Sequence, residues 1–319
     1  MLGNQNNQES FADIAINSKL PKKVQDTFLF KIDKAINFKH IETILEKLYT
    51  SNTGRPSIPP LILFKMLLLQ QYYNLSDPEL ELAVADRISF RRFVGLSFED
   101  SIPDETTIVR FRQRIINANC LNNLFHEVNQ QLHKKNLLVR KATIIDATLV
   151  ESSTKKPSNS EQPTDKDASW TSKRGQAHYG YKAHVSVDAE HNLIEKVELT
   201  TASVHDSNVF EELLPDDTQA VYADKAYVNR ERLTNLKSRG IENGILDKAY
   251  RNHQLSDEQI AANKRKSKIR TNIERVFAHW KRWFGYTKVR YKGLSKNRLQ
   301  LVLLSIAYNL KRSIALDMG

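Results

Sequence analysis

The chain has 319 residues, of which 40% are apolar and 27% charged. This composition is typical of a folded globular protein, and the length suffices for one large domain or two smaller ones. The single cysteine, Cys120, excludes a disulfide framework, and no apolar run approaches the ~20 residues of a membrane-spanning helix. The polar N-terminus lacks the apolar core of a secretory signal, so we expect a cytoplasmic protein.

The net charge of +11 is concentrated in one segment near the C-terminus. Residues 264–298 hold 13 of the 48 Lys and Arg residues but only one of the 37 acidic residues, Glu274. The rest of the chain is therefore close to neutral. A concentrated basic surface indicates a polyanionic ligand such as nucleic acid, and a solvated basic face is the alternative.

The N-terminal part of the chain predicts helices. Residues 1–50 give a polar lead with short helices, and the breaker-rich segment 53–60 opens a helical domain at 51–138. A helix from Pro59 to Tyr73 begins with proline in its first turn, and Ser76 is placed to cap the next helix.

A further helix of this domain opens at Pro103 and has two contrasting faces. Apolar side chains share one face, at Ile108, Phe111 and Ile115. Arg110 and Arg114 share another. Because a helix that packs on one side and presents arginines on the other suits the major groove, we predict that both arginines bind DNA. An ordinary solvated face is the alternative.

Residues 139–319 predict an α/β domain. Strands are expected at 142–146, 181–187, 193–200, 220–224 and 241–246. Helices are expected at 208–214, 229–238, 271–284 and 296–314. In the first of them, Asn208 and Glu211 are spaced as a variant of the capping box. Residues 152–178 are rich in Ser, Lys, Asp, Gln and Pro, which predicts a polar loop.

Two of the predicted strands end in a carboxylate, at Asp146 and Asp224. Ligands of α/β sheets collect beyond the carboxyl ends of strands. A carboxylate at the end of a buried strand is costly unless it is paired, hydrogen-bonded or bound to metal. We therefore predict that both residues are catalytic and bind metal, with a turn or helix cap as the alternative.

Glu274 is the third candidate. The helix at 271–284 carries an apolar stripe, and Arg270, Glu274 and Lys281 line an adjacent face. A surface pair between Arg270 and Glu274 is the alternative. A lone carboxylate among 13 cations nevertheless fits a metal ligand beside side chains that bind phosphate.

Three carboxylates are suitable ligands for Mg²⁺, which prefers oxygen. Two such ions about 3.5–4 Å apart activate the attacking oxygen and stabilise the leaving oxygen of a phosphodiester. The sequence holds no CxxC or HExxH pattern that would indicate zinc, and no P-loop that would indicate ATP.

Short motifs along nearly the whole chain are shared with one known family of proteins. They are Gly54-Arg55-Pro56, Tyr73-Asn74-Leu75-Ser76-Asp77, Phe90-Arg91-Arg92-Phe93-Val94-Gly95-Leu96, Pro103-Asp104-Glu105-Thr106-Thr107, Ile145-Asp146-Ala147-Thr148, His178-Tyr179-Gly180-Tyr181-Lys182, Val204-His205-Asp206-Ser207 and Ala223-Asp224-Lys225-Ala226-Tyr227. With them the chain resembles bacterial insertion-sequence transposases of the IS5 group, within the IS4-like Asp-Asp-Glu superfamily. The C-terminal signature of that superfamily is matched by Arg270, Glu274 and Lys281, whereas Ser267 stands where the superfamily has Tyr.

The resemblance implies an RNase H-like catalytic core, a mixed sheet with flanking helices, preceded by an all-helical DNA-binding domain. It implies that Asp146, Asp224 and Glu274 hold two Mg²⁺ ions, for which Mn²⁺ substitutes. It also implies that Arg270 and Lys281 lie near DNA phosphates and that a homodimer assembles on two paired transposon ends.

The expected function is therefore to bind terminal inverted repeats, cleave phosphodiester bonds and join the 3′-OH ends to target DNA. Two alternatives are a catalytically silent, transposase-derived repressor and a metal-dependent nuclease without strand transfer. We interpret Asp206 as a helix cap or a group that supports the metal ligands, and His178 and His205 as structural.

Overall fold

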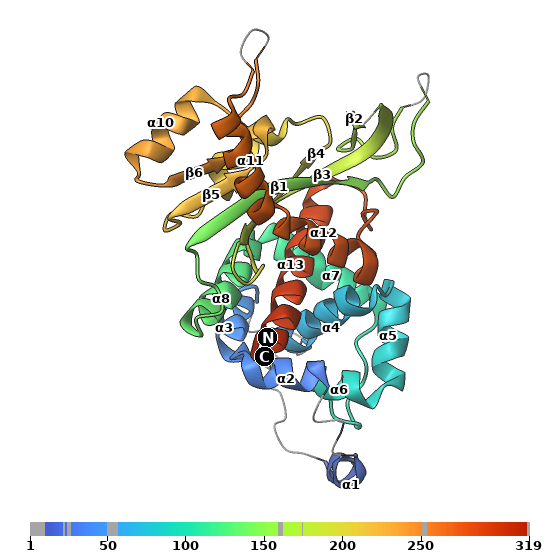
Figure 1. Cartoon of the computed structure of the whole chain (residues 1–319). Helices are drawn as coiled ribbons and strands as arrows, with labels where there is room; N and C mark the ends of the chain where they lie inside the picture. Colours follow the sequence, from blue (N-terminus) through green and yellow to red (C-terminus); the bar gives the residue numbers. More distant parts are fainter. Residues whose placement is uncertain are drawn as a thin grey trace. The chain divides into compact units, whose positions relative to one another are not determined.

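The computed structural model describes residues 10–21, 23, 27–49, 57–158, 162–173, 175–250 and 254–317, so Gly54-Arg55-Pro56 lies outside the described residues. The chain divides into two compact units (Figure 1). Unit 1 comprises Met1–Lys134 with Val302–Gly319, and unit 2 comprises Lys135–Leu301. No helix of the described residues has the length and hydropathy that crossing a membrane requires.

Unit 1 is helical, as expected. Its helices are α1 (Phe11–Lys19), α2 (Phe28–Ala35), α3 (Phe38–Glu46), α4 (Pro60–Tyr73), α5 (Asp77–Asp86), α6 (Ile88–Val94), α7 (Glu105–Asn117), α8 (Leu121–Lys134) and the later part of α13 (Leu294–Asp317). The predicted start signals are confirmed, because Pro60 lies in the first turn of α4 and Ser76 forms a capping box with Glu79 at α5.

Helix α4 forms the centre of unit 1. Every residue from Pro60 to Tyr72 is buried, which is the pattern of a helix surrounded by other helices. The one cation in this stretch, Lys65, pairs with Asp33 and lies over the ring of Phe38. Its charge is thus compensated without breaking the core.

Unit 2 is built on a mixed six-stranded sheet. Its strands are β1 (Ala142–Glu151), β2 (Ser169–Lys173), β3 (Gln176–Asp188), β4 (Ile194–Thr201), β5 (Ala220–Ala223) and β6 (Glu242–Ile245). Their order is β2-β3-β1-β5-β6, with β4 also on β3. β1, β3 and β4 pair antiparallel, whereas β1, β5 and β6 pair parallel. This mixed sheet with flanking helices confirms the RNase H-like class.

The prediction of a polar loop at 152–178 is wrong in part, because β2 forms a hairpin with β3 inside that segment. Two contacts explain how a polar sequence is ordered. Trp170 packs on Tyr179 with ring centroids 5.3 Å apart. The buried carboxylate of Asp165 accepts hydrogen bonds from the Tyr181 hydroxyl at 2.7 Å and the Gly293 backbone at 3.2 Å. Side-chain alternation alone does not reveal such long-range anchors.

Helices cover both faces of the sheet. Ile145 of β1 packs in a core with Phe210 of α9 (Phe210–Leu213) and Leu236 of α10 (Arg230–Ser238). Neighbouring residues of a strand point to opposite faces. Asp146 therefore faces the other side, where α11 (Asp257–Arg270) and α12 (Asn272–Trp283) contact β1.

The structure corrects one predicted helix start and adds a helix that was not predicted. The segment predicted to begin at Asn208 begins earlier, as η2 (Asp206–Val209), where the His205 ring accepts from the Ser207 backbone. Helix α11 was not predicted at all. It has no buried residue and hence no apolar stripe, although Ser256 and Gln259 form a capping box at its start.

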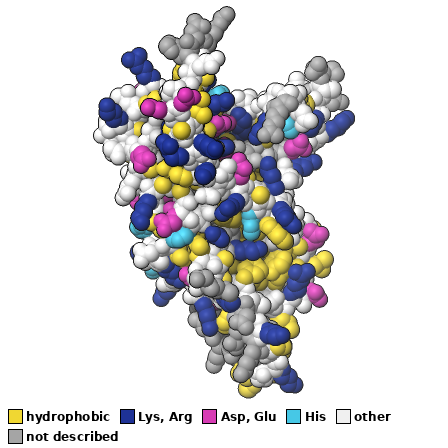
Figure 2. Space-filling model, viewed as in Figure 1, with side chains coloured by type: hydrophobic (Ala, Val, Ile, Leu, Met, Phe, Trp, Pro, Cys, Tyr) yellow, Lys and Arg dark blue, Asp and Glu magenta, His cyan; other side chains and the backbone are white. Residues whose placement is uncertain are grey.

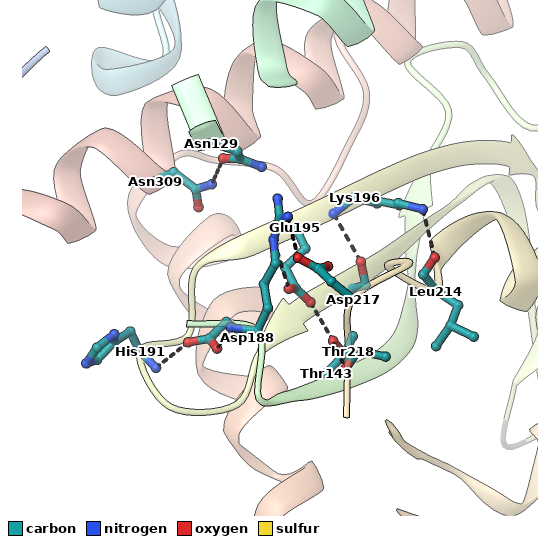
Figure 3. A network of polar contacts seen from close by, with 12 residues as sticks. Asn129, Thr143, Asp188, His191, Glu195, Lys196, Leu214, Asp217, Thr218 and Asn309 are labelled. Carbon is teal, nitrogen blue, oxygen red and sulfur yellow. Dashed lines mark hydrogen bonds and ion pairs between the residues drawn. The ribbon is translucent and has the colours of Figure 1, made fainter. Parts of the chain in front are cut away.

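A buried acid, Glu195, closes a chain of hydrogen bonds beside β1 (Figure 3). Its Oε2 lies 2.8 Å from Thr143 Oγ1, which lies 2.9 Å from Thr218 Oγ1, which lies 3.0 Å from the carbonyl oxygen of Ala220. The two hydroxyls carry only two protons for these three contacts. A proton on Glu195 completes the chain, in agreement with burial, which raises the pKa of Glu195 to about 8.

This protonated acid predicts a pH-dependent stability. Because the folded-state pKa is raised, from 4.5 to about 8, its favourable contribution is complete below about pH 4.5 and is lost as the pH rises through about 8. We expect the stability of Glu195→Gln relative to the wild type to increase over this range, by at most about 1.4 kcal/mol per pH unit. Urea unfolding at several pH values measures it, and parallel curves for the two proteins would contradict it.

Candidate active site

Asp146 and Asp224 lie side by side on neighbouring parallel strands. The last residue pair between β1 and β5 is Ile145 with Ala223, so the two carboxylates follow directly at the same level of the sheet. Neighbouring strands are only about 4.8 Å apart. Asp224 directly follows β5 and caps the short helix Lys225–Tyr227, accepting from the Lys225 backbone at 2.7 Å, so the cap that was the alternative interpretation is present. β1 continues to Glu151, so the prediction that Asp146 ends its strand is wrong. Asp146 lies instead where its parallel partner ends.

The surroundings of Asp146 disfavour its charge. Burial, together with the carboxylates of Asp224 and Asp206, raises the pKa of Asp146 to about 6. A hydrogen bond from the Ala147 backbone at 2.8 Å and the guanidinium of Arg270 at 2.8 Å act in the opposite direction. The position therefore favours added positive charge.

Glu274 is connected to this pair through Arg270. One guanidinium nitrogen of Arg270 donates to Asp146, and another lies 3.6 Å from Glu274 Oε1. Arg270 ends α11 and Glu274 lies in the first turn of α12, which brings the predicted helix face to β1. Within the described ranges, no three His, Cys, Asp or Glu side chains are grouped closely enough to hold a metal ion.

Asp206 is not a helix cap, which corrects one of its two interpretations. His205 caps η2, and Asp206 Oδ1 pairs with Lys182 Nζ at 2.9 Å. Lys182 also donates to the carbonyl of Val204 at 2.7 Å. Asp206 nevertheless acts on the site, because its charge raises the pKa of Asp146.

The hydroxyl of Tyr227 lies among the same acids. Burial raises its pKa, and the charges of Asp146, Asp206 and Asp224 raise it further, in that order. Asp206 begins η2, and Asp224 and Tyr227 are the cap and the last residue of η3 (Lys225–Tyr227), which contacts η2. Asp146, Asp206 and Asp224 therefore lie near one another and near the Tyr227 hydroxyl.

Arg232, which no motif of the sequence marks as functional, holds these two short helices together as a clamp. Its buried guanidinium donates to the Tyr227 carbonyl and to the Ser207 carbonyl and hydroxyl, and pairs with Glu211. It also lies 4.1 Å from the centre of the Phe210 ring. No local pattern distinguishes Arg232 from its exposed neighbour Arg230.

The predicted DNA-binding residues lie in both units. Arg110 is exposed on α7, whereas Arg114 lies 4.2 Å from the ring centre of Tyr49. In unit 2, Arg270 is held by Asp146, and Lys281 is exposed on α12. Partial burial and the charge of Lys173 lower the pKa of Lys281, so an anionic partner would be favourable there.

Comparison with known families defines the class of the protein. Residues 138–310, more than half of the chain, match the family described as "Transposase DDE domain", and residues 18–114 match "Transposase domain (DUF772)". The chain belongs to the DDE transposase family. It is an insertion-sequence transposase, an enzyme that cuts and joins DNA.

Solved transposase structures show a distant likeness. A piggyBac transposase synaptic complex with hairpin DNA is 10% identical, with a TM-score of 0.44 over 92% of this chain and 75% of that one. A Mos1 strand transfer complex is also 10% identical, with a TM-score of 0.20 over 80% of this chain and 86% of that one. A Mos1 paired-end complex has a TM-score of 0.21 at 10% identity, over 90% of this chain and 95% of that one.

Arg232→Ala tests the clamp. Because it leaves buried carbonyls of Ser207 and Tyr227 without their donor, we expect a loss of roughly 2–4 kcal/mol in the free energy of unfolding. Urea denaturation measures this loss. Arg230→Ala, on the exposed side of the same helix, is the matched control and should change stability little. Equal effects of the two substitutions would show that the clamp is not needed.

Proposed function

We propose that this transposase binds the terminal inverted repeats of an insertion sequence, cleaves phosphodiester bonds there and joins the 3′-OH ends to target DNA. One observation carries the proposal: Asp146 and Asp224 lie side by side at the carboxyl end of β5, and Arg270 connects Asp146 to Glu274. The site would act on DNA in the bacterial cytoplasm.

The side chains fit divalent metal ions. Asp146, Asp224 and Glu274 offer only oxygen donors, which suit Mg²⁺ or Mn²⁺. The half-buried carboxylate of Asp146, beside a second carboxylate, gains from added positive charge. We propose that these three residues hold two ions, which when bound supply Lewis acidity and neutralise charge on the phosphodiester.

The chain's own cations complete the site. Arg270 stabilises the charged form of Asp146 and, at the end of α11, is placed to contact a DNA phosphate beside it. Lys281 lies two turns beyond Glu274 on α12 and adds a second cation for the backbone. The Lys182–Asp206 pair and the Arg232 clamp fix the short helices that position Asp224.

The helix α7 in unit 1 is the proposed reader of the terminal repeat. Its Ile108, Phe111 and Ile115 are buried, as predicted, and Arg110 and Arg114 are exposed. We propose that this face enters the major groove and that two copies of the chain assemble on paired ends.

Amide substitutions test the acidic triad. Asp146→Asn, Asp224→Asn and Glu274→Gln keep the shape but remove the charge, so each should lower metal-dependent cleavage of terminal-repeat DNA by roughly 100-fold or more. Binding of the same DNA should remain. Asp217→Asn, which pairs with Arg140 outside the site, is the matched control.

The assay is cleavage of end DNA with Mg²⁺ or Mn²⁺, with EDTA as the blank. Normal cleavage by all three amide variants would contradict the assignment. Cleavage by the wild type without strand transfer from a supplied 3′-OH end would indicate the nuclease, and binding without any cleavage would indicate the repressor.

Arg110→Ala tests the reading helix. We expect it to weaken binding to the terminal repeat by about 1–3 kcal/mol and to affect unrelated DNA much less. Fluorescence anisotropy at fixed salt measures both affinities. Lys39→Ala, an exposed cation on α3, serves as control and should lower both affinities equally or not at all. An equal loss on both DNAs for Arg110→Ala would exclude a role in reading sequence.

A further inference from the structure

The cations of the basic segment differ in their contacts. Some are engaged by unit 2 itself. Lys266 donates to the Ile245 carbonyl at 2.9 Å and pairs with Asp247 at 3.1 Å. Arg298 pairs with Glu198, and Arg270 with Asp146. The charges of these three side chains are thus already balanced by carboxylates of unit 2.

Four other cations are exposed and form two pairs on successive helices, which together are called the row. They are Lys264 and Lys268 on α11 and Arg275 and Arg282 on α12. Within the part of the chain that the structure describes, none of them forms an ion pair with a carboxylate. Lys and Arg side chains gather over this part of unit 2 (Figure 2). Charge that the fold does not use is available to a ligand.

The spacing aligns the side chains in two pairs. Lys264 and Lys268 are four residues apart and Arg275 and Arg282 are seven apart, so each pair shares one face of its helix. Thr271 ends α11 and precedes α12, and its ψ of −14° departs from that of an α-helix, so the two faces belong to separate, successive helices. The pairs span about 6 Å and about 10 Å of helix.

The row also has a defined relation to the acidic site. Arg270 and Glu274 turn toward β1 from the same two helices, whereas Arg275 directly follows Glu274 and is exposed. The row therefore runs beside the carboxylates on the same face of the sheet. Arg282 lies 5.2 Å from the Trp283 ring centre, which restricts its guanidinium.

We infer that Lys264, Lys268, Arg275 and Arg282 form a track for the phosphate backbone of duplex DNA, along which the DNA reaches the acidic site. The inference rests on the proposed function and adds to it the path of the DNA on unit 2. A duplex carries one negative charge per about 1.7 Å of its axis, so two cations about 6 Å or about 10 Å apart along a helix can face different phosphates. Contacts of this kind position DNA and do not read its sequence.

The test is the salt dependence of DNA binding by the full-length chain. Each phosphate contact contributes about 0.9 to the slope of log K against log salt concentration, so Lys264→Ala with Lys268→Ala should reduce the slope by about 1.8. Arg275→Ala with Arg282→Ala should reduce it by a similar amount. The probe is a short labelled duplex of arbitrary sequence, in EDTA, measured by anisotropy.

The matched control is Arg230→Ala with Lys237→Ala. These two cations are exposed and seven residues apart on α10, which packs on the opposite face of the sheet. The control should leave the slope unchanged. All substituted residues are exposed and alanine favours helices, so thermal melting should show an intact fold for each variant.

Three outcomes decide the inference. A lower slope in both row variants but not in the control supports it. An unchanged slope in the row variants overturns the track, and if the same variants still cleave terminal-repeat DNA the proposed function stands without it. An equal decrease of the slope in the row variants and in the control also overturns it, since the effect would then reflect net charge alone.

Discussion

Two carboxylates at the same level of neighbouring parallel strands impose a cost on which the rest of unit 2 depends. Asp146 is half-buried on β1, and Asp224 follows the last paired residue of β5. Their mutual repulsion has to be balanced by a cation, and in the structure Arg270 provides one to Asp146. The Arg232 clamp and the Lys182–Asp206 pair then fix the loops around the acids. The fold thus holds negative charge together in advance of its ligand.

Much of the fold was predictable from local pattern. Apolar, β-branched runs indicated the strands, apolar spacing indicated α7 and α12, and proline or serine placement indicated the starts of α4 and α5. Helix α11 was missed because none of its residues is buried, so that only the capping box of Ser256 and Gln259 marked it. β2 was missed because the order of its segment depends on distant contacts such as Gly293 with Asp165. Local pattern carries no information about such partners.

The candidate site was predictable as a set of residue types but not as an arrangement. The nearness of Asp146 and Asp224 depends on the register of two strands whose paired residues Ile145 and Ala223 are 78 positions apart in the sequence (223 − 145). The i, i+4 spacing indicated that Arg270 could pair with Glu274, but nothing local predicted its second contact with Asp146, or that Arg232 would act as a clamp. The assignment of the triad as metal ligands remains a prediction, supported by the acidic pair and the oxygen-only donors.

The most direct measurement is the anomalous diffraction of Mn²⁺ in crystals of the chain with terminal-repeat DNA. The account predicts manganese peaks between Asp146 and Asp224, with Glu274 as a further ligand and Arg270 moved from Asp146 toward a DNA phosphate. Peaks only at other carboxylates, with the Arg270–Asp146 contact unchanged in the presence of saturating metal and DNA, would contradict it.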